Sequence, residues 1–408
     1  MRPGAKRIAL FLDGTWNTVR DNTNVWRLRA LCAEQSADGA RQVVYYDTGV
    51  GSRKGEKLRG GMFGYGLDSN VISAYRWLIE NYEPGDDVFV FGFSRGAFTA
   101  RSLTGLIAKC GLLQPGAPLS VEQIFKRYID SKATRPIYQL QFEQRELSRR
   151  LKRGESSTDE PRIFPPSREE QWLLSYSQRI NIEFTGVFDT VGSLGVPFGN
   201  FWFSSKRSQF HHTRLSNLYR RTYQALAIDE HRRHFSPAIW TKFTPLQTGA
   251  QARTPRLQPL VEQRWFVGAH ANIGGGYIDD RLAQIPLAWL VEKATLTGLS
   301  FKYPVQIDPG SFRDPVADSY SQFAGGFYKL ATFGQRHLRS IGSGRFGVAS
   351  PPGYVKSVNE TIDASVFDRW RSDAAYRPQN LATWATLRQV DPACLMGAVS
   401  ADSAEVIT

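Results

Sequence analysis

The sequence predicts an α/β fold in which a mostly parallel β-sheet carries helices on both faces and is interrupted by helical and loop insertions. Two observations support this prediction. Short apolar, β-branched or aromatic runs alternate with stretches of helical periodicity, and the runs are apolar at nearly every position. Such strands are buried on both faces, which is typical of a parallel sheet between two layers of helices.

The expected strands follow one another along the chain. They are Ile8–Leu12, Val43–Tyr46, Val88–Phe91, Ile182–Phe188 and Arg264–Val267. The first run follows basic residues, as the apolar core of a signal peptide does. It is shorter than the roughly 7–15 apolar residues that a signal peptide needs, and Asp13 ends it. We therefore interpret it as the first buried strand.

Three helices are expected between or after these strands. The first starts at Asp68, its predicted N-cap, and its apolar stripe comprises Val71, Ile72, Tyr75, Leu78, Ile79 and Tyr82. A second helix follows Gly96 and ends near Gly111. A third covers about residues 283–297. Helices between buried strands are what a parallel sheet with two covered faces requires.

We expect residues 1–408 to form a single α/β domain, although this length, at about 150 residues per domain, also allows two or three. Residues 112–180 are polar and helical in places, which predicts a helical insertion. Residues 196–217 are aromatic, and we interpret them as a lid-like insertion. The Gly- and Pro-rich portion 301–408 is expected to pack on the same domain.

The composition excludes several classes of protein. Hydrophobic residues make up 41% of the chain and charged residues 22%, which excludes wholesale disorder. The three cysteines stand at long spacings and fit neither a disulfide framework nor a Cys-based zinc site. The sequence contains no run of about 18 apolar residues, so we predict no membrane span. We expect a cytoplasmic protein, or one exported by a route that uses no signal peptide.

The chain is basic, with 51 Lys and Arg against 38 Asp and Glu and a net charge of +13. Nucleic acid, an anionic membrane surface or solubility alone can each account for such a charge. Opposite charges are interspersed through most of the chain, so we favour solubility and expect no nucleic-acid partner. One basic cluster stands apart, inside a predicted helix, and comprises Arg145, Arg149, Arg150, Lys152 and Arg153.

The strongest candidate for chemistry is Gly92-Phe93-Ser94-Arg95-Gly96. It joins an expected strand to an expected helix, which is the setting of a nucleophile elbow. In such a turn the serine is strained and its hydroxyl exposed, and N–H groups of the helix can stabilise an oxyanion. The alternative is a Gly-rich turn with an inert serine. The placement favours Ser94 as a nucleophile.

A serine needs a base, and the chain order in hydrolases of this kind is serine, acid, histidine. His270 lies just past the strand Arg264–Val267, at the end of a strand where an α/β sheet places its site. Asp189 follows the strand Ile182–Phe188 and can orient an imidazole. The alternatives are a structural loop histidine and a turn-capping aspartate. Weaker rivals for the acid are Asp229, Glu230 and Asp279.

The backbone N–H of Arg95, directly after the serine, is the first predicted oxyanion donor. A second is expected from Gly14 or Thr15, in the loop after the first strand, although a tight turn there is an equally good interpretation. The stretch Gly342–Gly347 has the spacing of a dinucleotide loop but lacks the flanking strand and helix. We predict no metal site and no cofactor.

Phe201 and Trp202, inside the aromatic insertion, are the predicted substrate-binding residues. Aromatic rings followed by Lys206 and Arg207 suit an acyl chain beneath an anionic head group, or peripheral contact with a membrane. The equally good alternative is that these rings pack as satellite core. The sequence does not indicate the oligomeric state.

Eight motifs follow one another over about residues 7–381: Phe11–Asn17, Thr23–Val25, Gly92–Ala97, Val187–Gly192, Ala227–Arg232, Gly268–Tyr277, Asn359–Ile362 and Tyr376–Leu381. With this ordered set the chain resembles the α/β-hydrolase domain of type VI secretion phospholipase effectors of the Tle group and their uncharacterised relatives. The resemblance implies an α/β-hydrolase-like fold and a triad of Ser94, Asp189 and His270. It also implies acyl-ester substrates, which are phospholipids for the characterised effectors.

We therefore expect a serine hydrolase of the lipase or phospholipase type. Two alternatives stay open. The same machinery could cleave a non-lipid ester, a thioester or an amide. The chain could also be a catalytically silent module that holds an anionic partner through the basic cluster at residues 145–153.

Overall fold

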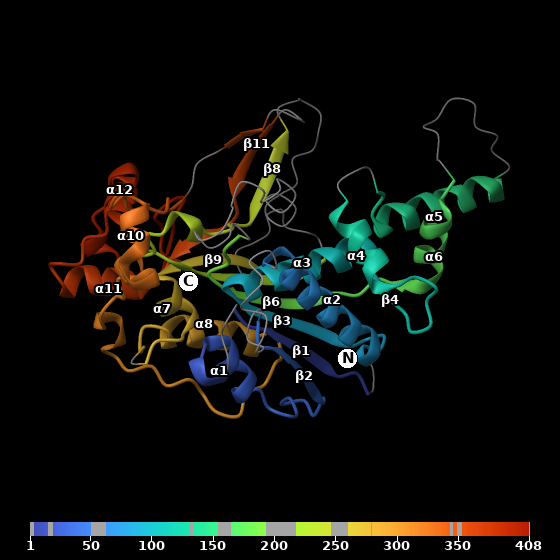
Figure 1. The fold of residues 1–408 in the computed structure, drawn as a ribbon, viewed down its shortest axis with the longest axis horizontal. Coiled ribbons are helices and arrows are strands. Elements are labelled where there is room, and N and C mark those ends of the chain that lie inside the picture. Colours follow the sequence, from blue (N-terminus) through green and yellow to red (C-terminus); the bar gives the residue numbers. More distant parts are fainter. Residues whose placement is uncertain are drawn as a thin grey trace.

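An eight-stranded β-sheet crosses the centre of the molecule (Figure 1). The computed structural model describes residues 4–14, 19–49, 63–130, 134–153, 165–192, 218–245, 260–278, 280–342, 346–348 and 353–407. The strand order is β13-β12-β9-β7-β6-β3-β1-β2. Neighbouring strands are parallel except for the β12–β13 pair at one edge, so the predicted α/β class with a mostly parallel sheet is confirmed.

The strands of this sheet are β1 (Arg7–Leu12), β2 (Gln42–Asp47), β3 (Asp87–Phe93), β6 (Ile182–Phe188), β7 (Tyr219–Ala227), β9 (Val261–Phe266), β12 (Glu360–Ile362) and β13 (Val399–Ser400). Each of the five predicted strands is present. The sequence does not predict β7, which lies at the centre of the sheet, because its N-terminal half reads as the polar stretch Tyr219-Arg220-Arg221-Thr222.

Helices cover both faces of the sheet. On one face lie α2 (Phe63–Asn81) and α3 (Ser94–Cys110), and on the other lie α1 (Asn24–Leu31), α7 (His270–Gly274) and α8 (Gln284–Thr295) (Figure 1). The predicted N-cap at Asp68 is wrong, because α2 begins five residues earlier and Asp68 lies within the helix.

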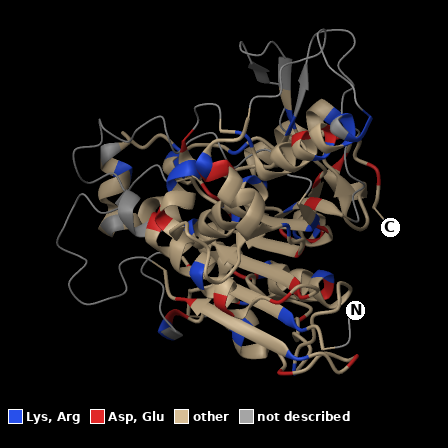
Figure 2. Ribbon diagram, turned by 90° about the vertical axis from the view of Figure 1, so that its right-hand side faces the viewer, with Lys and Arg blue, Asp and Glu red and all other residues tan. Residues whose placement is uncertain are grey.

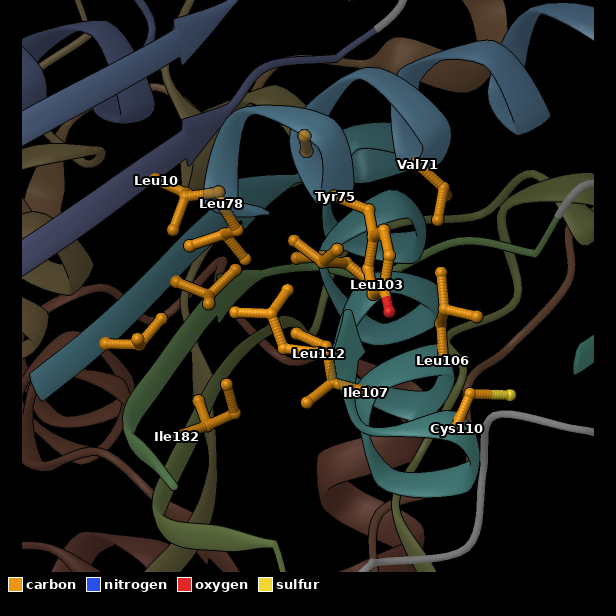
Figure 3. Close-up of a cluster of buried hydrophobic side chains, with 14 of the residues drawn as sticks. Leu10, Val71, Tyr75, Leu78, Leu103, Leu106, Ile107, Cys110, Leu112 and Ile182 are labelled. Atoms are coloured by element: carbon orange, nitrogen blue, oxygen red, sulfur yellow. The ribbon is translucent and has the colours of Figure 1, made fainter. Parts of the chain in front are cut away.

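A hydrophobic core lies on each face of the sheet, between the strands and these helices. Alternate residues of β1 enter different cores, because successive side chains of a strand point to opposite faces. Leu10 packs against α2 and α3 with Tyr75 and Leu103 (Figure 3), and Phe11 packs against α1 and α8. The runs that are apolar at every position are therefore strands buried on both sides.

The order of the strands in the sheet reverses at β1. From β1 the chain adds β2 on one side and then returns to add β3 on the other. Open α/β sheets bind ligands at the carboxyl ends of the strands where the order reverses in this way. Both Gly14, after β1, and Ser94, after β3, stand at this reversal.

The remaining elements lie outside the main sheet. Between α3 and β6 are β4 (Leu112–Leu113), α4 (Val121–Ile129), α5 (Ile137–Arg153), α6 (Arg168–Tyr176) and β5 (Ser177–Gln178). A separate antiparallel sheet contains β8 (Thr241–Pro245), β10 (Phe346–Val348) and β11 (Gly353–Ser357). The C-terminal portion, which also supplies β12 and β13 of the main sheet, contributes the helices α9 (Ser319–Gln322), α10 (Phe327–Ala331), α11 (Ala364–Ser372) and α12 (Gln379–Arg388).

Some predicted residues lie outside the described ones. These are the aromatic insertion, with Phe201 and Trp202, and the oxyanion candidate Thr15. Over the described residues, basic and acidic side chains stand interspersed on the ribbon (Figure 2). Within the described ranges, every helix is too short or too polar to cross a membrane.

The core on the α2–α3 face provides a test of this packing. Replacing Leu103, a fully buried side chain, with Ala should lower the free energy of unfolding by about 2–5 kcal/mol, because the mutation leaves a cavity. The matched control is Leu296→Ala, since Leu296 is 74% exposed and should change stability by about 0.5 kcal/mol or less. Chemical denaturation measures both, and equal effects would contradict the proposed packing.

Candidate active site

Ser94 stands at a sharp turn between β3 and α3. Its backbone has a φ of +57°, a left-handed conformation that is rare for serine. The flanking glycines are required by space. A Cβ on Gly92 would lie 2.6 Å from the carbonyl oxygen of Gly96, and one on Gly96 would clash with the backbone oxygens of Leu12 and Asp13. The G-x-S-x-G pattern therefore allows the start of α3 to pack against the end of β1.

Three side chains from the ends of three strands meet at this turn. The Nε2 atom of His270 lies 2.8 Å from Oγ of Ser94, and its Nδ1 atom lies 2.6 Å from Oδ2 of Asp189. Asp189 follows β6 and has a φ of +40°, while His270 opens α7 directly after β9. The carboxyl ends of parallel strands lie on the same side of a sheet. Asp189 therefore lies next to Ser94 and His270, although it is 95 positions from Ser94 and 81 from His270 in the sequence.

The carboxylate of Asp189 has a second partner, the cationic Arg339, which the sequence does not predict. Arg339 donates from Nη1 to Oδ1 at 2.6 Å and from Nη2 to Oδ2 at 2.9 Å, a bidentate contact. The Nη1 group also donates to the carbonyl of Ala227, whose own N–H donates to Oδ1 of Asp189. Arg339 is only 2% exposed. Arginines are mostly exposed, so no pattern in the sequence distinguishes this buried one.

These contacts set the charges in the site. Burial by itself would raise the pKa of Asp189, but Arg339 and the hydrogen bond from His270 hold it well below its ordinary value. Burial lowers the pKa of His270, and the neighbouring Asp189 offsets only part of this effect. Near neutral pH the carboxylate is therefore ionised and the imidazole neutral. The Nδ1–H of His270 then faces Asp189, and Nε2 is left to accept a proton from Ser94.

The imidazole is enclosed by two aromatic rings. The ring centroids of Phe93 and Phe235 lie 4.8 Å and 5.0 Å from that of His270. Phe235 belongs to a one-turn 3-10 helix, Arg233–Phe235. The Cζ atom of the Arg232 guanidinium lies over its ring, 3.6 Å from the ring centroid. His270 is only 5% exposed. These rings exclude water from the histidine and cause the burial that lowers its pKa.

Two of the rival acids, Glu230 and Asp229, bind the backbone of the segment that contains His270. Glu230 is buried, accepts the backbone N–H of His270 at 3.2 Å and forms an ion pair with Arg232, which helps to hold its pKa at about 2. Asp229 accepts from the N–H of Gly268 at 2.7 Å and from the hydroxyl of Tyr376 at 3.0 Å. Both therefore fix backbone around the site, while Asp189 contacts the imidazole. The third rival, Asp279, lies outside the described residues.

The loop after β1 is held by a buried carboxylate. Asp13 accepts the N–H of Gly14 at 2.8 Å, the hydroxyl of Thr23 at 2.6 Å and the hydroxyl of Tyr46 at 3.0 Å. The N–H of Gly14 is engaged by this carboxylate, so the structure gives no support to Gly14 as an oxyanion donor. The N–H of Arg95 belongs to the first turn of α3, next to Ser94.

The other described histidines have different partners. Nδ1 of His234 lies 2.8 Å from the hydroxyl of Tyr328, and Nδ1 of His231 lies 3.3 Å from the carbonyl of His337. Among the residues that the structure describes, no three His, Cys, Asp or Glu side chains gather as a metal site would require.

The fold is that of an α/β-hydrolase-like protein, with a serine, a histidine and an aspartate hydrogen-bonded in series at the sheet edge. Residues 6–293 match the family model of the type VI secretion system (T6SS) phospholipase effector Tle1-like catalytic domain. The chain belongs to this family, and the resemblance of the motifs is confirmed. Arg339 and the last two motifs of the sequence lie beyond the matched residues.

Relatives and solved structures were also found. An uncharacterized protein of Saccharomyces cerevisiae, YEL023C, is 29% identical over 253 residues, which cover 58% of this chain and 33% of the yeast protein. An uncharacterized protein from Pseudomonas aeruginosa is similar over 80% of this chain and 51% of its own, at 16% identity and a TM-score of 0.39.

Two further solved structures are similar to the chain. The Tle1 effector bound to the VgrG spike is 18% identical, covers 67% of this chain and 51% of its own, and has a TM-score of 0.33. Esterase 2 of Thermogutta terrifontis, in its apo form, is 15% identical, with coverage of 74% and 87% and a TM-score of 0.34. The chain thus spans about a third of the yeast relative and about half of the two bacterial chains reported first.

The bidentate contact of Arg339 predicts a titration shift. Replacing Arg339 with Met removes the positive charge beside Asp189. The pKa at which the Asp189–His270 pair binds its proton should therefore rise by about one unit or more. NMR titration of the histidine rings measures this, with His234 as an internal control that should not move. Arg339→Lys keeps the charge and should shift the pair less. An unchanged or lower titration of His270 in Arg339→Met would contradict this electrostatic role.

Proposed function

We propose that the chain is a serine hydrolase that cleaves acyl esters and that its substrates are phospholipids. The observation that supports this proposal most is the continuous series of hydrogen bonds from Ser94 through His270 to Asp189. This series lies at the carboxyl ends of the strands, where α/β sheets bind ligands. Membership of the Tle1-like phospholipase family supports the substrate class. We also infer export without a signal peptide, since the family is that of type VI secretion effectors.

The reaction would begin with an attack by Oγ of Ser94 on the carbonyl carbon of the ester. As the C–O bond forms, Nε2 of His270 accepts the hydroxyl proton. The tetrahedral intermediate then collapses, the imidazolium returns this proton to the leaving alcohol oxygen, and an acyl-serine remains. A water molecule repeats the sequence, with His270 as the base, and releases the fatty acid and free Ser94.

Asp189 would act through the histidine. Its ionised carboxylate holds the proton on Nδ1 of His270 and stabilises the imidazolium that forms during attack. Arg339 donates a hydrogen bond to each oxygen of this carboxylate and so holds it in position. Its positive charge also keeps the buried carboxylate ionised. Burial keeps the imidazole of His270 neutral before the reaction, because the neighbouring Asp189 offsets only part of the effect of burial on its pKa.

The oxyanion would be stabilised at the start of α3. The N–H of Arg95 lies in the first helical turn, where backbone donors and the helix dipole favour negative charge. The loop after β1 is the proposed source of the second donor, as the sequence predicts. Because the N–H of Gly14 is bound by Asp13, the other candidate of the sequence prediction is Thr15, which lies outside the described residues.

Two substitutions test the proposal directly. Ser94→Ala and His270→Ala should each lower turnover of a phospholipid or ester substrate by a factor on the order of 10⁴–10⁶, and the double variant should lose little more. The matched control is Ser102→Ala, because Ser102 is buried in the same helix and should leave turnover unchanged. Near-normal turnover by a folded Ser94→Ala variant would contradict the assignment of Ser94 as the nucleophile. Failure of the wild type to react with a fluorophosphonate probe would instead favour a silent binding module.

The pKa of His270 predicts the pH dependence. The base must be neutral, and burial lowers its pKa from the ordinary value of about 6.5. Activity should therefore persist below that pH, and kcat/KM should fall only when more acidic solution protonates His270. Asp189→Asn should keep the fold and lose about 10⁴ in kcat, because the wrong tautomer is favoured. An acidic limb centred clearly above pH 6.5 would contradict the buried, neutral histidine.

A further inference from the structure

Residues 319–334 form a segment, here called the strap, that exposes large apolar side chains. It comprises α9, a 3-10 turn (Phe323–Gly326), α10 and the residues up to Gly334 (orange in Figure 1). Phe327 is 52% exposed, Leu330 75% and Phe333 91%. Three large apolar side chains exposed within seven residues are unusual for a water-soluble surface and indicate contact with an apolar partner.

The inner side of the strap is packed and leads to the candidate catalytic histidine. The ring of Phe323 lies 5.9 Å from that of Phe235, which in turn lies 5.0 Å from that of His270. Behind Phe323, the ring of Tyr328 lies at 5.7 Å. A continuous row of aromatic rings therefore connects α10 with the candidate active site.

A hydrogen bond anchors the strap to the same site. The hydroxyl of Ser319, the first residue of α9, donates to Glu230 at 2.9 Å, and Glu230 also accepts the backbone N–H of His270. Tyr328 adds a second anchor, since its hydroxyl lies 2.8 Å from Nδ1 of His234. The strap is thus fixed on its inner side and exposes its apolar residues on the other.

The backbone on both sides of α10 is left-handed. Gly325 and Gly326 precede the helix with φ values of +65° and +90°, and Phe333 and Gly334 follow it with +51° and +73°. Phe333 follows the C-cap of α10 in this conformation, and the N–H of Gly334 donates to the carbonyl of Lys329 at 2.9 Å, which closes the helix end. The backbone at both ends of α10 therefore fixes this short helix while its apolar side chains stay exposed.

The charges beside the patch match an anionic lipid surface. Lys329 is exposed on α10 between Phe327 and Leu330, and Arg336 is exposed just beyond the strap, where it pairs with Asp318. Exposed aromatic and aliphatic side chains next to Lys and Arg are typical of elements that lie in the membrane interface.

We propose that Phe327, Leu330 and Phe333 form a lipid-contacting surface, which inserts into the apolar layer of a phospholipid membrane or aggregate and holds the candidate active site next to its lipid substrate. This inference rests on the proposed function for its substrate. The exposed Lys329 beside these apolar side chains favours an anionic lipid surface over a protein partner.

Binding is tested apart from catalysis in the Ser94→Ala background, by flotation with phosphatidylcholine vesicles that do or do not contain phosphatidylglycerol. Leu330→Ser and Phe333→Ser should each weaken binding by about tenfold, since each removes a large apolar side chain from the lipid. The matched control is Leu387→Ser on α12, because Leu387 is also 75% exposed and should bind as before. Lys329→Gln should lose only the increase caused by phosphatidylglycerol.

Turnover is then compared with Ser94 intact. The patch variants should lose about tenfold or more on vesicles and stay within about twofold on a short soluble ester. Equal vesicle binding by Leu330→Ser and Leu387→Ser would overturn the proposal. So would equal loss on both substrates, or a patch that instead mediates self-association in sedimentation experiments. Patch-dependent vesicle binding without any hydrolysis would support the surface while refuting the proposed function.

Discussion

The buried carboxylate of Asp189 is the interaction on which the site depends. Removing a charged group from water costs several kcal/mol unless hydrogen bonds and opposite charges replace the lost hydration. Here the N–H of Ala227, both ends of the Arg339 guanidinium and the imidazole of His270 supply them. These partners come from β7, from the C-terminal portion and from the loop after β9. The carboxylate therefore links three distant parts of the chain at one point of the sheet edge.

The parallel sheet makes this convergence possible. Because all the central strands run in one direction, the residues that follow β1, β3, β6 and β9 arrive at the same edge. Two cores hold the strands rigidly between helices, so Ser94 can keep a left-handed backbone conformation that costs free energy. On the far side of His270, the inner side of the strap packs against the site through Phe235 and Phe323.

Much of the site could be predicted because its residues follow strong local signals. Gly92 and Gly96 flank the turn at Ser94, and Asp189 and His270 each follow a predicted strand. Arg339 has no such signal, since a buried arginine and a surface arginine look alike in sequence. The sequence predicts the start of α2 wrongly and does not predict β7, because the local signal differs from the structure at both places. Asp68 is a good N-cap residue inside a helix, and the first half of β7 is polar.

The sequence by itself determined the α/β class, five of the strands, the family and the three residues that meet at the sheet edge. These follow from periodicity and from short motifs whose physical requirements are local, such as the glycines that the turn at Ser94 needs. Only the tertiary structure decided that Arg339 holds Asp189, that Asp13 engages the N–H of Gly14, and that residues 319–334 expose an apolar surface. Partners far apart in the chain are chosen by burial and charge in three dimensions, and no local pattern records that choice.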